Sequence, residues 1–410
     1  MNVSHIALAL LAGAWLAACD SPESLVTSAP SVDSLATLDA STTATSLGEP
    51  LRDLTADEMA RFDAGLDEFV EVETVDDGLG PVFNEASCAT CHTNPVGGTN
   101  GRKETRFGAL ANGVFDPLAG HGGSLIQDQG IGLVSTGGDY TFLAEVVPVE
   151  ATVSAGRLTT PLFGLGLVDA VPDAALIQLA RLEAATSPAT AGTPHMVTEI
   201  RTGQMRVGRF GWKAQVPTLF QFSGDAYLNE MGITNPEFPN ENCPQGDCSS
   251  LGHNPAPTLN DDGAGVDAFA DFMMLLAPPP RGPTSLVALQ GRSVFSAIGC
   301  ATCHTPTLVT GASPVAALSR KAFQPFSDFL LHDMGALGDG IAQGSATSSQ
   351  MRTAPLWGLH TRALLLHDGR ATTIAQAIRF HSGQGTASRN RFLRLSAFQR
   401  FALLKFLSTL

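Results

Sequence analysis

The sequence predicts a mainly α-helical protein, built from two related domains whose helices are joined by long ordered loops. Three observations support this fold class. The motif Cys-Ala-Thr-Cys-His occurs at 88–92 and again at 300–304. Apolar segments at 266–280 and 396–407 have helical spacing, and a proline run ends the first of them. Strand signals are few, whereas glycine (42) and proline (25) are abundant among the 410 residues.

Residues 1–19 predict a lipoprotein-type signal peptide. Ile6 to Ala18 form an apolar run that is short for a membrane span and typical of a signal sequence. The run ends in Leu-Ala-Ala-Cys and resembles a bacterial lipoprotein signal, so Cys19 is the expected lipid attachment site, although no Lys or Arg precedes the run. An ordinary cleaved signal peptide is the alternative. Residues 20–50 are rich in Ser, Thr and Ala and predict a flexible tether.

Each Cys-Ala-Thr-Cys-His motif has the composition of a c-type haem attachment site. Two thiols form thioethers with the haem vinyl groups, and the next histidine becomes the proximal iron ligand. A thioredoxin-like redox motif would need a βαβ context, which the sequence does not suggest. A zinc site would need another cysteine pair close in sequence. We therefore expect two covalent haems, attached through Cys88, Cys91, Cys300 and Cys303, with proximal ligands His92 and His304.

The surroundings of the two motifs form an internal repeat. "GPVFNEASCATCHTNP" resembles "GRSVFSAIGCATCHTP", and "RLTTPLFGLGL" resembles "RTAPLWGLHTR". A helix, a haem motif, loops and a closing helix follow the plan of a cytochrome c domain. The sequence thus predicts two cytochrome c-like haem domains with long ordered loops. Residues 51–282 form the first, with a long insertion, and residues 283–410 form the compact second.

The charge of the chain is unevenly distributed. Residues 1–282 hold 12 Lys/Arg and 35 Asp/Glu, whereas residues 283–410 hold 12 Lys/Arg and only 4 Asp/Glu. The acidic balance and the lack of a basic patch with interleaved aromatics exclude a nucleic-acid partner. The asymmetry can steer a charged partner, or it can reflect arginines that neutralise haem propionates beside a solvated acidic half.

Two further cysteines, Cys243 and Cys248, lie in "ENCPQGDC". In an oxidising compartment they are expected to pair, with a metal site as the alternative.

From about residue 53 to the end, the chain resembles the bacterial di-haem cytochrome c peroxidase superfamily. More closely it resembles the di-haem oxidoreductases classed as peroxidases or thiol oxidoreductases. The matching stretches include "GLGPVFNEASCATCH", "RLTTPLFGLGLVDAVP", "GRFGWKA" and "RTAPLWGLHTRALLLHDGRATTIAQAIRFHSG". The resemblance implies that the C-terminal haem relays electrons and that the N-terminal haem reduces peroxide. It also implies a calcium ion between the domains, for which acidic residues at 259–265 are a possible source.

The sixth ligand decides whether a haem relays electrons or binds peroxide. For the C-terminal haem, the distal position of the family falls on His381, where His replaces the usual Met, and Met334 is the second choice. The other histidines considered there are His332, His360 and His367. For the N-terminal haem, His121 and Met205 are candidates, and a vacant or displaceable site is favoured.

Four further residues are assigned roles by position. Asp169 follows Pro161 in the stretch where the peroxidases place a catalytic Glu, so it is the candidate acid–base group, with a helix cap as the alternative. Arg157 and Arg352 occupy equivalent places in the repeat and are candidates for binding haem propionates. Trp212 is the candidate electron path between the haems, although tryptophan more often packs in a core.

Together these features predict an exported, periplasmic, peroxidase-like di-haem oxidoreductase, anchored to a membrane through Cys19. Its expected partners are a small electron-donor protein, either a cytochrome or a cupredoxin, and hydrogen peroxide or a related oxidant. Two alternatives remain open. One is an electron-transfer cytochrome with no substrate of its own. The other is a haem enzyme that oxidises a thiol or another side chain of a protein.

Overall fold

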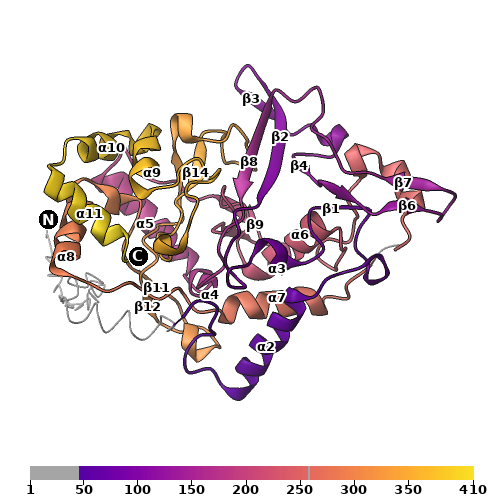
Figure 1. Ribbon diagram of the computed structural model, residues 1–410, viewed down its shortest axis with the longest axis horizontal. Helices are drawn as coiled ribbons and strands as arrows, with labels where there is room; N and C mark the ends of the chain where they lie inside the picture. The colour runs from indigo at the N-terminus through magenta and orange to yellow at the C-terminus, as the bar shows by residue number, and fades with distance from the viewer. Residues whose placement is uncertain (1–45, 257–258) are drawn as a thin grey trace, which may run out of the picture.

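The computed structural model describes residues 46–256 and 259–410 (Figure 1). The expected signal peptide, Cys19 and most of the expected tether lie outside these residues. In the described part of the chain, no helix combines the length and the apolar character needed to cross a membrane.

The N-terminal motif lies beside a pair of packed helices. Helix α2 (Ala56–Val70) begins at a capping box in which the Thr55 and Glu58 side chains bond each other's backbone amides. It packs against α7 (Ala264–Leu275), one of the two closing helices expected from the sequence. The helices approach closely at Gly65, where a Cβ would lie 2.4 Å from the carbonyl oxygen of Ala268. A glycine therefore sets the separation of these two helices.

The C-terminal motif lies beside an equivalent helix pair. Helix α8 (Leu286–Ala297) packs against α11 (Ala397–Leu407), the second expected closing helix. Here the close approach is at Gly291, where a Cβ would lie 1.9 Å from the carbonyl oxygen of Ala402. In each pair a phenylalanine, Phe69 or Phe295, follows the glycine by one helical turn and is buried. The repeat noticed in the sequence thus includes a repeated helix crossing.

The prediction of a mainly α protein is wrong. Helices, including short 3-10 turns, make up 36% of the described residues and strands make up 15%, so the fold is mixed α/β. The largest sheet lies in the expected insertion, where β2 (Lys103–Ala111) pairs with β3 (Val114–Asp116), β4 (Leu125–Ile126) and β8 (Val153–Leu158). The β2 sequence, "KETRFGALA", is poor in β-branched residues. Pairing with a distant strand, rather than local propensity, therefore makes this segment extended.

The other sheets are two-stranded and antiparallel. They are β1 (Val82–Phe83) with β5 (Gln129–Gly130), β6 (Gly132–Val134) with β7 (Tyr140–Phe142), β9 (Met196–Thr198) with β10 (Met205–Val207), β11 (Leu308–Val309) with β12 (Ala322–Phe323), and β13 (Leu331–Asp333) with β14 (Gln350–Arg352). The other α-helices are α3 (Cys88–Cys91), α4 (Leu165–Asp169), α5 (Asp173–Thr186), α6 (Leu219–Met231), α9 (Ile374–Phe380) and α10 (Thr386–Leu393).

Two main apolar cores hold the molecule together. The smaller core is formed within 288–410, where α8, α9, α10 and α11 gather at the left of Figure 1. The larger core surrounds α2, α6 and α7, and it also takes in Leu308, Phe323 and Trp357 from the second half of the chain. The domain boundary near residue 282 stays a prediction, since residues on both sides of it share this core.

Candidate haem sites

The N-terminal motif forms one helical turn that faces a cavity. Helix α3 carries Cys88 and Cys91, and its end is His92, whose amide bonds the Cys88 carbonyl at 3.0 Å. All three side chains line the cavity, which we call the N-terminal cavity. Burial raises the pKa of both thiols to about 12 and lowers the pKa of His92 to about 4. The His92 imidazole is therefore neutral near pH 7, and one of its ring nitrogens keeps a lone pair that could bind iron.

The C-terminal motif faces a second cavity, which we call the C-terminal cavity. Cys300, Cys303 and His304 line it, and His381 lines it as well. The Nδ1 atoms of His304 and His381 lie 3.0 and 2.8 Å from the carbonyl oxygens of Phe326 and Ala377. Because a carbonyl only accepts, each Nδ1 carries the hydrogen and each Nε2 keeps its lone pair. Burial also lowers the pKa of both imidazoles, so both are neutral near pH 7.

The spacing of these two rings fits one iron between them. Their centroids lie 6.4 Å apart. Two imidazoles that bind one metal from opposite sides, with metal–nitrogen bonds of about 2 Å, would have centroids about 6 Å apart. Met334 lines the same cavity and remains the second candidate.

Two arginines, one buried and one partly buried, place positive charge in the C-terminal cavity. Arg352 and Arg362 both line it, and burial lowers the pKa of each guanidinium to about 10. Arg352 donates to the Gly211 carbonyl at 2.7 Å, and Arg362 donates to the Trp357 carbonyl at 2.9 Å. Within the described residues neither forms an ion pair with a carboxylate. Two uncompensated cations are what the two propionates of a haem would neutralise, so this cavity fits the group.

Arg157 differs from its repeat partner. It lines the N-terminal cavity, but its guanidinium bonds Asp339 at 2.7 Å, and Asp339 also pairs with Lys213 at 2.9 Å. All three side chains are almost completely buried. Since Asp339 already neutralises Arg157, and Glu85 and Asp128 pair with Arg102 at 2.8 and 3.0 Å, Lys103 is the further cation of the N-terminal cavity that could meet a propionate.

Trp212 lies in the wall between the two cavities. Six residues line both of them, namely Leu158, Thr159, Thr160, Gly211, Trp212 and Phe222. The indole N–H of Trp212 donates to the Leu158 carbonyl at 2.9 Å, and the ring meets His367 edge-on at 6.2 Å between centroids. The backbone around it is fixed by Arg352, whose amide bonds the Trp212 carbonyl at 2.9 Å. The role of Trp212 as an electron path stays a prediction.

The N-terminal cavity contains polar groups that no sequence motif marks. Glu104 and Arg106 on β2 form a bidentate pair with both contacts at 3.0 Å. Asp225 and Glu230 on α6 line the cavity beside them. Burial raises the pKa of Asp225 to about 6 and that of Glu230 to about 7. No motif links these residues, because the tertiary packing of a strand on a helix brings them together.

The candidate sixth ligands of this site lie elsewhere. Among the described residues that line the N-terminal cavity, His92 is the one histidine. Met205 is 56% exposed and His121 is partly exposed, and neither residue lines the cavity. Asp169 lines neither cavity: its Oδ1 accepts the Leu219 amide at 3.2 Å at the start of α6, and burial raises its pKa to about 6.

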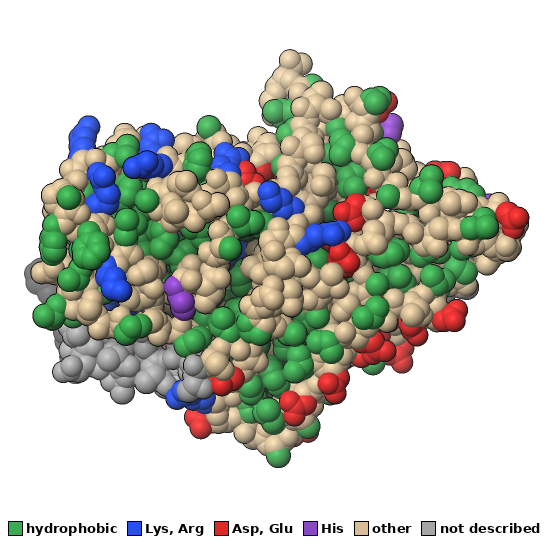
Figure 2. Space-filling view, in the orientation of Figure 1, with side chains coloured by type: hydrophobic (Ala, Val, Ile, Leu, Met, Phe, Trp, Pro, Cys, Tyr) green, Lys and Arg blue, Asp and Glu red, His purple; other side chains and the backbone are tan. Residues whose placement is uncertain are grey.

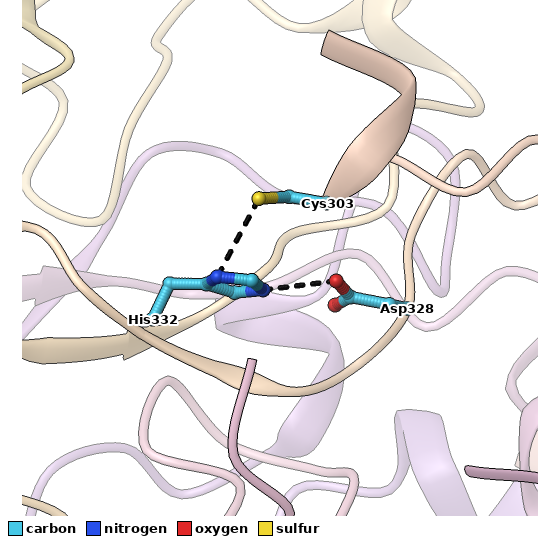
Figure 3. Close-up of side chains that lie close together, drawn as sticks. All are labelled: Cys303, Asp328 and His332. Carbon is cyan, nitrogen blue, oxygen red and sulfur yellow. Dashed lines mark hydrogen bonds and ion pairs between the residues drawn. The ribbon is translucent and has the colours of Figure 1, made fainter. Parts of the chain in front are cut away.

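Cys303, His332 and Asp328 form a compact cluster beside the C-terminal motif (Figure 3). The Cys303 sulfur lies 3.4 Å from Nδ1 of His332, and Nε2 of His332 lies 2.9 Å from Asp328. Burial opposes protonation of His332, but the bond to Asp328 outweighs it and raises the pKa to about 11. A protonated imidazole does not bind a metal, so His332 is better suited to an anchor beside Cys303 than to an iron ligand. His360 is also engaged, since its Nδ1 bonds the Leu410 carbonyl at 2.7 Å.

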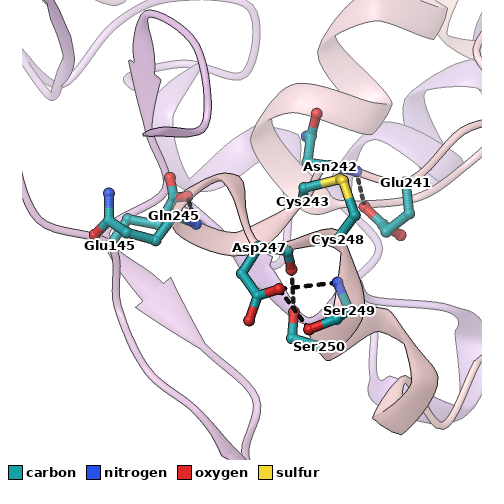
Figure 4. The surroundings of a disulfide bond; sticks show 9 residues. All are labelled: Glu145, Glu241, Asn242, Cys243, Gln245, Asp247, Cys248, Ser249 and Ser250. Atoms are coloured by element: carbon teal, nitrogen blue, oxygen red, sulfur yellow. Dashed lines mark hydrogen bonds between the residues drawn. A yellow bond between two sulfur atoms is a disulfide. The ribbon is translucent and has the colours of Figure 1, made fainter. Parts of the chain in front are cut away.

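The expected disulfide is confirmed. Cys243 and Cys248 are bonded, in a turn held by Asp247 and by the contact of Glu145 with the Gln245 amide at 2.6 Å (Figure 4). The calcium ion stays a prediction. Within the described chain, the acidic residues at 259–265 belong to no group of three ligand atoms close enough to hold one ion.

Two buried Cys-Ala-Thr-Cys-His sites that share a wall define a class of redox protein that holds two haems. A family model described as "Di-haem oxidoreductase, putative peroxidase" matches residues 148–410, and the chain belongs to this family. The resemblance inferred from the motifs is thereby confirmed. The chain is a peroxidase-like di-haem oxidoreductase by family.

Solved structures give weaker likenesses. A hydrazine synthase chain from Kuenenia stuttgartiensis shows 12% identity and a TM-score of 0.38, covering 98% of this chain and 99% of its own. A MauG-like protein associated with microbial copper homeostasis shows 14% identity and a TM-score of 0.40, and the match covers 90% of this chain and 93% of that protein. The di-haem peroxidase BthA from Burkholderia thailandensis shows 13% identity and a TM-score of 0.38, and the match covers 90% of this chain and 95% of that protein. No curated protein sequence matches the chain. The family assignment rests on the family model.

Proposed function

We propose that this protein is an exported c-type di-haem oxidoreductase that reduces hydrogen peroxide or a related small oxidant. The observation that carries the proposal is the contrast between the two cavities. The C-terminal cavity holds a second histidine facing the motif histidine, whereas the described lining of the N-terminal cavity offers carboxyl groups and the thioethers of Met231 and Met273 but no second histidine. One site suits electron relay, and the other suits binding of a small substrate.

In this proposal Cys88, Cys91, Cys300 and Cys303 would hold the haems as thioethers, and His92, His304 and His381 would bind the irons. The haems would supply one-electron chemistry, and electrons would enter at the C-terminal haem and be used at the N-terminal haem. Arg352 and Arg362 neutralise propionates. Trp212 forms the path through the shared wall, and Arg352 holds its backbone in place.

The carboxyl groups of the N-terminal cavity would handle protons. Reduction of one peroxide to two waters consumes two electrons and two protons, so a proton donor must lie near the cleaved O–O bond. Asp225 and Glu230 line the cavity and have pKa values raised toward neutrality by burial, which lets them bind and release a proton near pH 7. Arg106 fixes Glu104 beside them. Asp169, the residue selected by motif position, lies outside this cavity.

The location and partners complete the proposal. A signal peptide would direct the chain to the periplasm, and a lipid on Cys19 would anchor it through a tether of about 30 residues. The Cys243–Cys248 disulfide agrees with an oxidising compartment. A small cytochrome or cupredoxin would deliver electrons, and peroxide would be consumed.

Low-temperature electron paramagnetic resonance tests the proposal on the protein with both haems attached. Spectra are recorded fully oxidised and half-reduced, before and after hydrogen peroxide is added. A high-spin signal that peroxide consumes is the expected result. Two low-spin signals in both states, unchanged by peroxide, would refute the proposal and leave an electron-transfer cytochrome.

A further inference from the structure

The last three helices carry a charge pattern that the proposed chemistry does not use. Residues 374–410 contain six Lys/Arg and no Asp or Glu, although the chain as a whole has 39 acidic residues against 24 basic ones. The six cations are Arg379, Arg389, Arg391, Arg394, Arg400 and Lys405. Within the described residues none of them forms an ion pair with a carboxylate. Internal stability gives no reason for this excess, since like charges on one face repel each other.

Large apolar side chains are exposed on the same helices. Phe398 and Phe401 on α11 are 56% and 59% exposed, Leu393 on α10 is 48% exposed, and Phe380 on α9 is 42% exposed. Figure 2 shows Lys and Arg side chains interspersed with hydrophobic ones over the part of the molecule where Figure 1 places α9, α10 and α11. We call this surface the basic helical face, and define it by Arg379, Arg391, Arg394, Arg400 and Lys405 together with these four apolar residues. An apolar patch with charges around it is the composition of a protein-docking surface.

The basic helical face is the outer side of the wall of the C-terminal cavity. Gly385, Ser388 and Arg389 of the α10 region and Leu407 of α11 line the cavity from within. Arg389 also donates to the carbonyl of His381 at 3.0 Å. A single helix layer, about 10 Å across, therefore separates a partner on this face from the cavity.

We propose that the basic helical face docks an acidic electron-donor protein, whose redox centre is surrounded by carboxylates. This inference rests on the proposed function, because it names the partner that would supply electrons to the C-terminal haem. The charge pattern decides the class of donor: a protein with a basic rim would be repelled, and one with an acidic rim would be steered to the face. The exposed phenylalanines would then supply the apolar contact beside the charged rim.

The test uses the full chain with both haems, and two probes of similar size: an acidic cupredoxin and a basic cytochrome c. Affinity for each oxidised probe is measured by isothermal titration calorimetry at low and high ionic strength. The rate at which each reduced probe reduces the protein is measured by stopped-flow spectroscopy without peroxide. Since no peroxide is present, a protein that fails to turn over peroxide would still give an answer on docking.

The variant is the double charge reversal Arg394→Glu with Lys405→Glu, at two exposed positions outside both cavities. Its matched control is Arg181→Glu, an exposed arginine on α5. We expect the reversal to weaken binding of the acidic probe and slow its electron transfer at least about tenfold at low salt, with the difference shrinking at high salt. The control Arg181→Glu should bind and accept electrons from the acidic probe as the wild type does. The rate at which a small neutral reductant reduces the double-reversal variant should also equal that of the wild type. Phe401→Ala should weaken binding without changing its salt dependence.

Three outcomes would overturn the proposal. The first is an acidic-probe rate that the reversal leaves unchanged. The second is that the wild-type chain dimerises in sedimentation experiments and that the double reversal abolishes the dimer. The acidic half of a second copy would then occupy the basic helical face. The third is binding to anionic vesicles that depends on Arg394 and Lys405 while the acidic probe does not bind, because the face would then serve a membrane.

Discussion

Gly291 offers a sharp test of how the helices beside the C-terminal haem motif are held. A Cβ at this position would lie 1.9 Å from the Ala402 carbonyl oxygen and 2.8 Å from Cβ of Phe406. Real Cβ atoms hardly ever come within 3.0 Å of another heavy atom, so Gly291→Ala must force α8 and α11 apart by about 1 Å. The movement would also disturb the contact between Phe295 and Phe406, whose ring centroids are 5.5 Å apart.

Two effects of this substitution oppose each other, and their sizes decide the sign. Replacing a helical glycine by alanine stabilises a helix by roughly 0.5–1 kcal/mol. Overpacking a core costs typically about 1–3 kcal/mol, and a backbone contact cannot be relieved by a rotamer change. We therefore expect Gly291→Ala to lower the free energy of unfolding by about 1–2 kcal/mol.

Urea unfolding of the haem-loaded protein, followed by far-ultraviolet circular dichroism, measures this change. Ser293→Ala, on the exposed side of the same helix, is the control and should be neutral or slightly stabilising. Gly65→Ala, with a contact of 2.4 Å to α7, should destabilise in the same direction. A Gly291→Ala protein as stable as the wild type would refute the argument that these crossings require glycine.

Four further predictions follow from the sites. His381→Ala should convert the C-terminal haem from low spin to high spin in paramagnetic resonance, whereas Met334→Leu should not; the reverse result would assign the ligand to Met334. Trp212→Phe should slow electron transfer between the haems in stopped-flow traces, and an unchanged rate would exclude the indole as the path. Asp339→Asn should cost about 3–5 kcal/mol in urea unfolding, because it leaves Lys213 and Arg157 buried without their carboxylate, while Asp333→Asn at an exposed position should cost little. Burial raises the pKa of Asp169 from 3.8 to about 6. The folded chain therefore binds this proton more tightly than the unfolded chain does. As pH rises from about 4 to 6, ionisation of the carboxylate increasingly destabilises the fold. Asp169→Asn should therefore raise the free energy of unfolding by about 2–3 kcal/mol at pH 8 and by almost nothing at pH 4, and an equal gain at both values would contradict the assignment.

The sequence by itself determined the features whose chemistry is local. Two thiols and a histidine within five residues must present themselves together on one turn, so the Cys-Ala-Thr-Cys-His motifs could be interpreted without a fold. The closing helices α7 and α11 followed from apolar spacing, and the Cys243–Cys248 pair followed from two nearby cysteines in a turn. The family was also recognisable from these short stretches, and the family model confirms it.

Tertiary structure decided whatever depends on residues far apart in the chain. The sheet of the insertion was missed because β2 pairs with β8 about 50 residues later, and local propensity did not mark it as a strand. Glu104, Asp225 and Glu230 meet in one cavity although no spacing connects them. Arg157 and Arg352 are equivalent in the repeat, but Asp339 neutralises one and no carboxylate pairs with the other in the described chain. A repeat predicts that two positions correspond, whereas their charge partners depend on which distant segments fold against them.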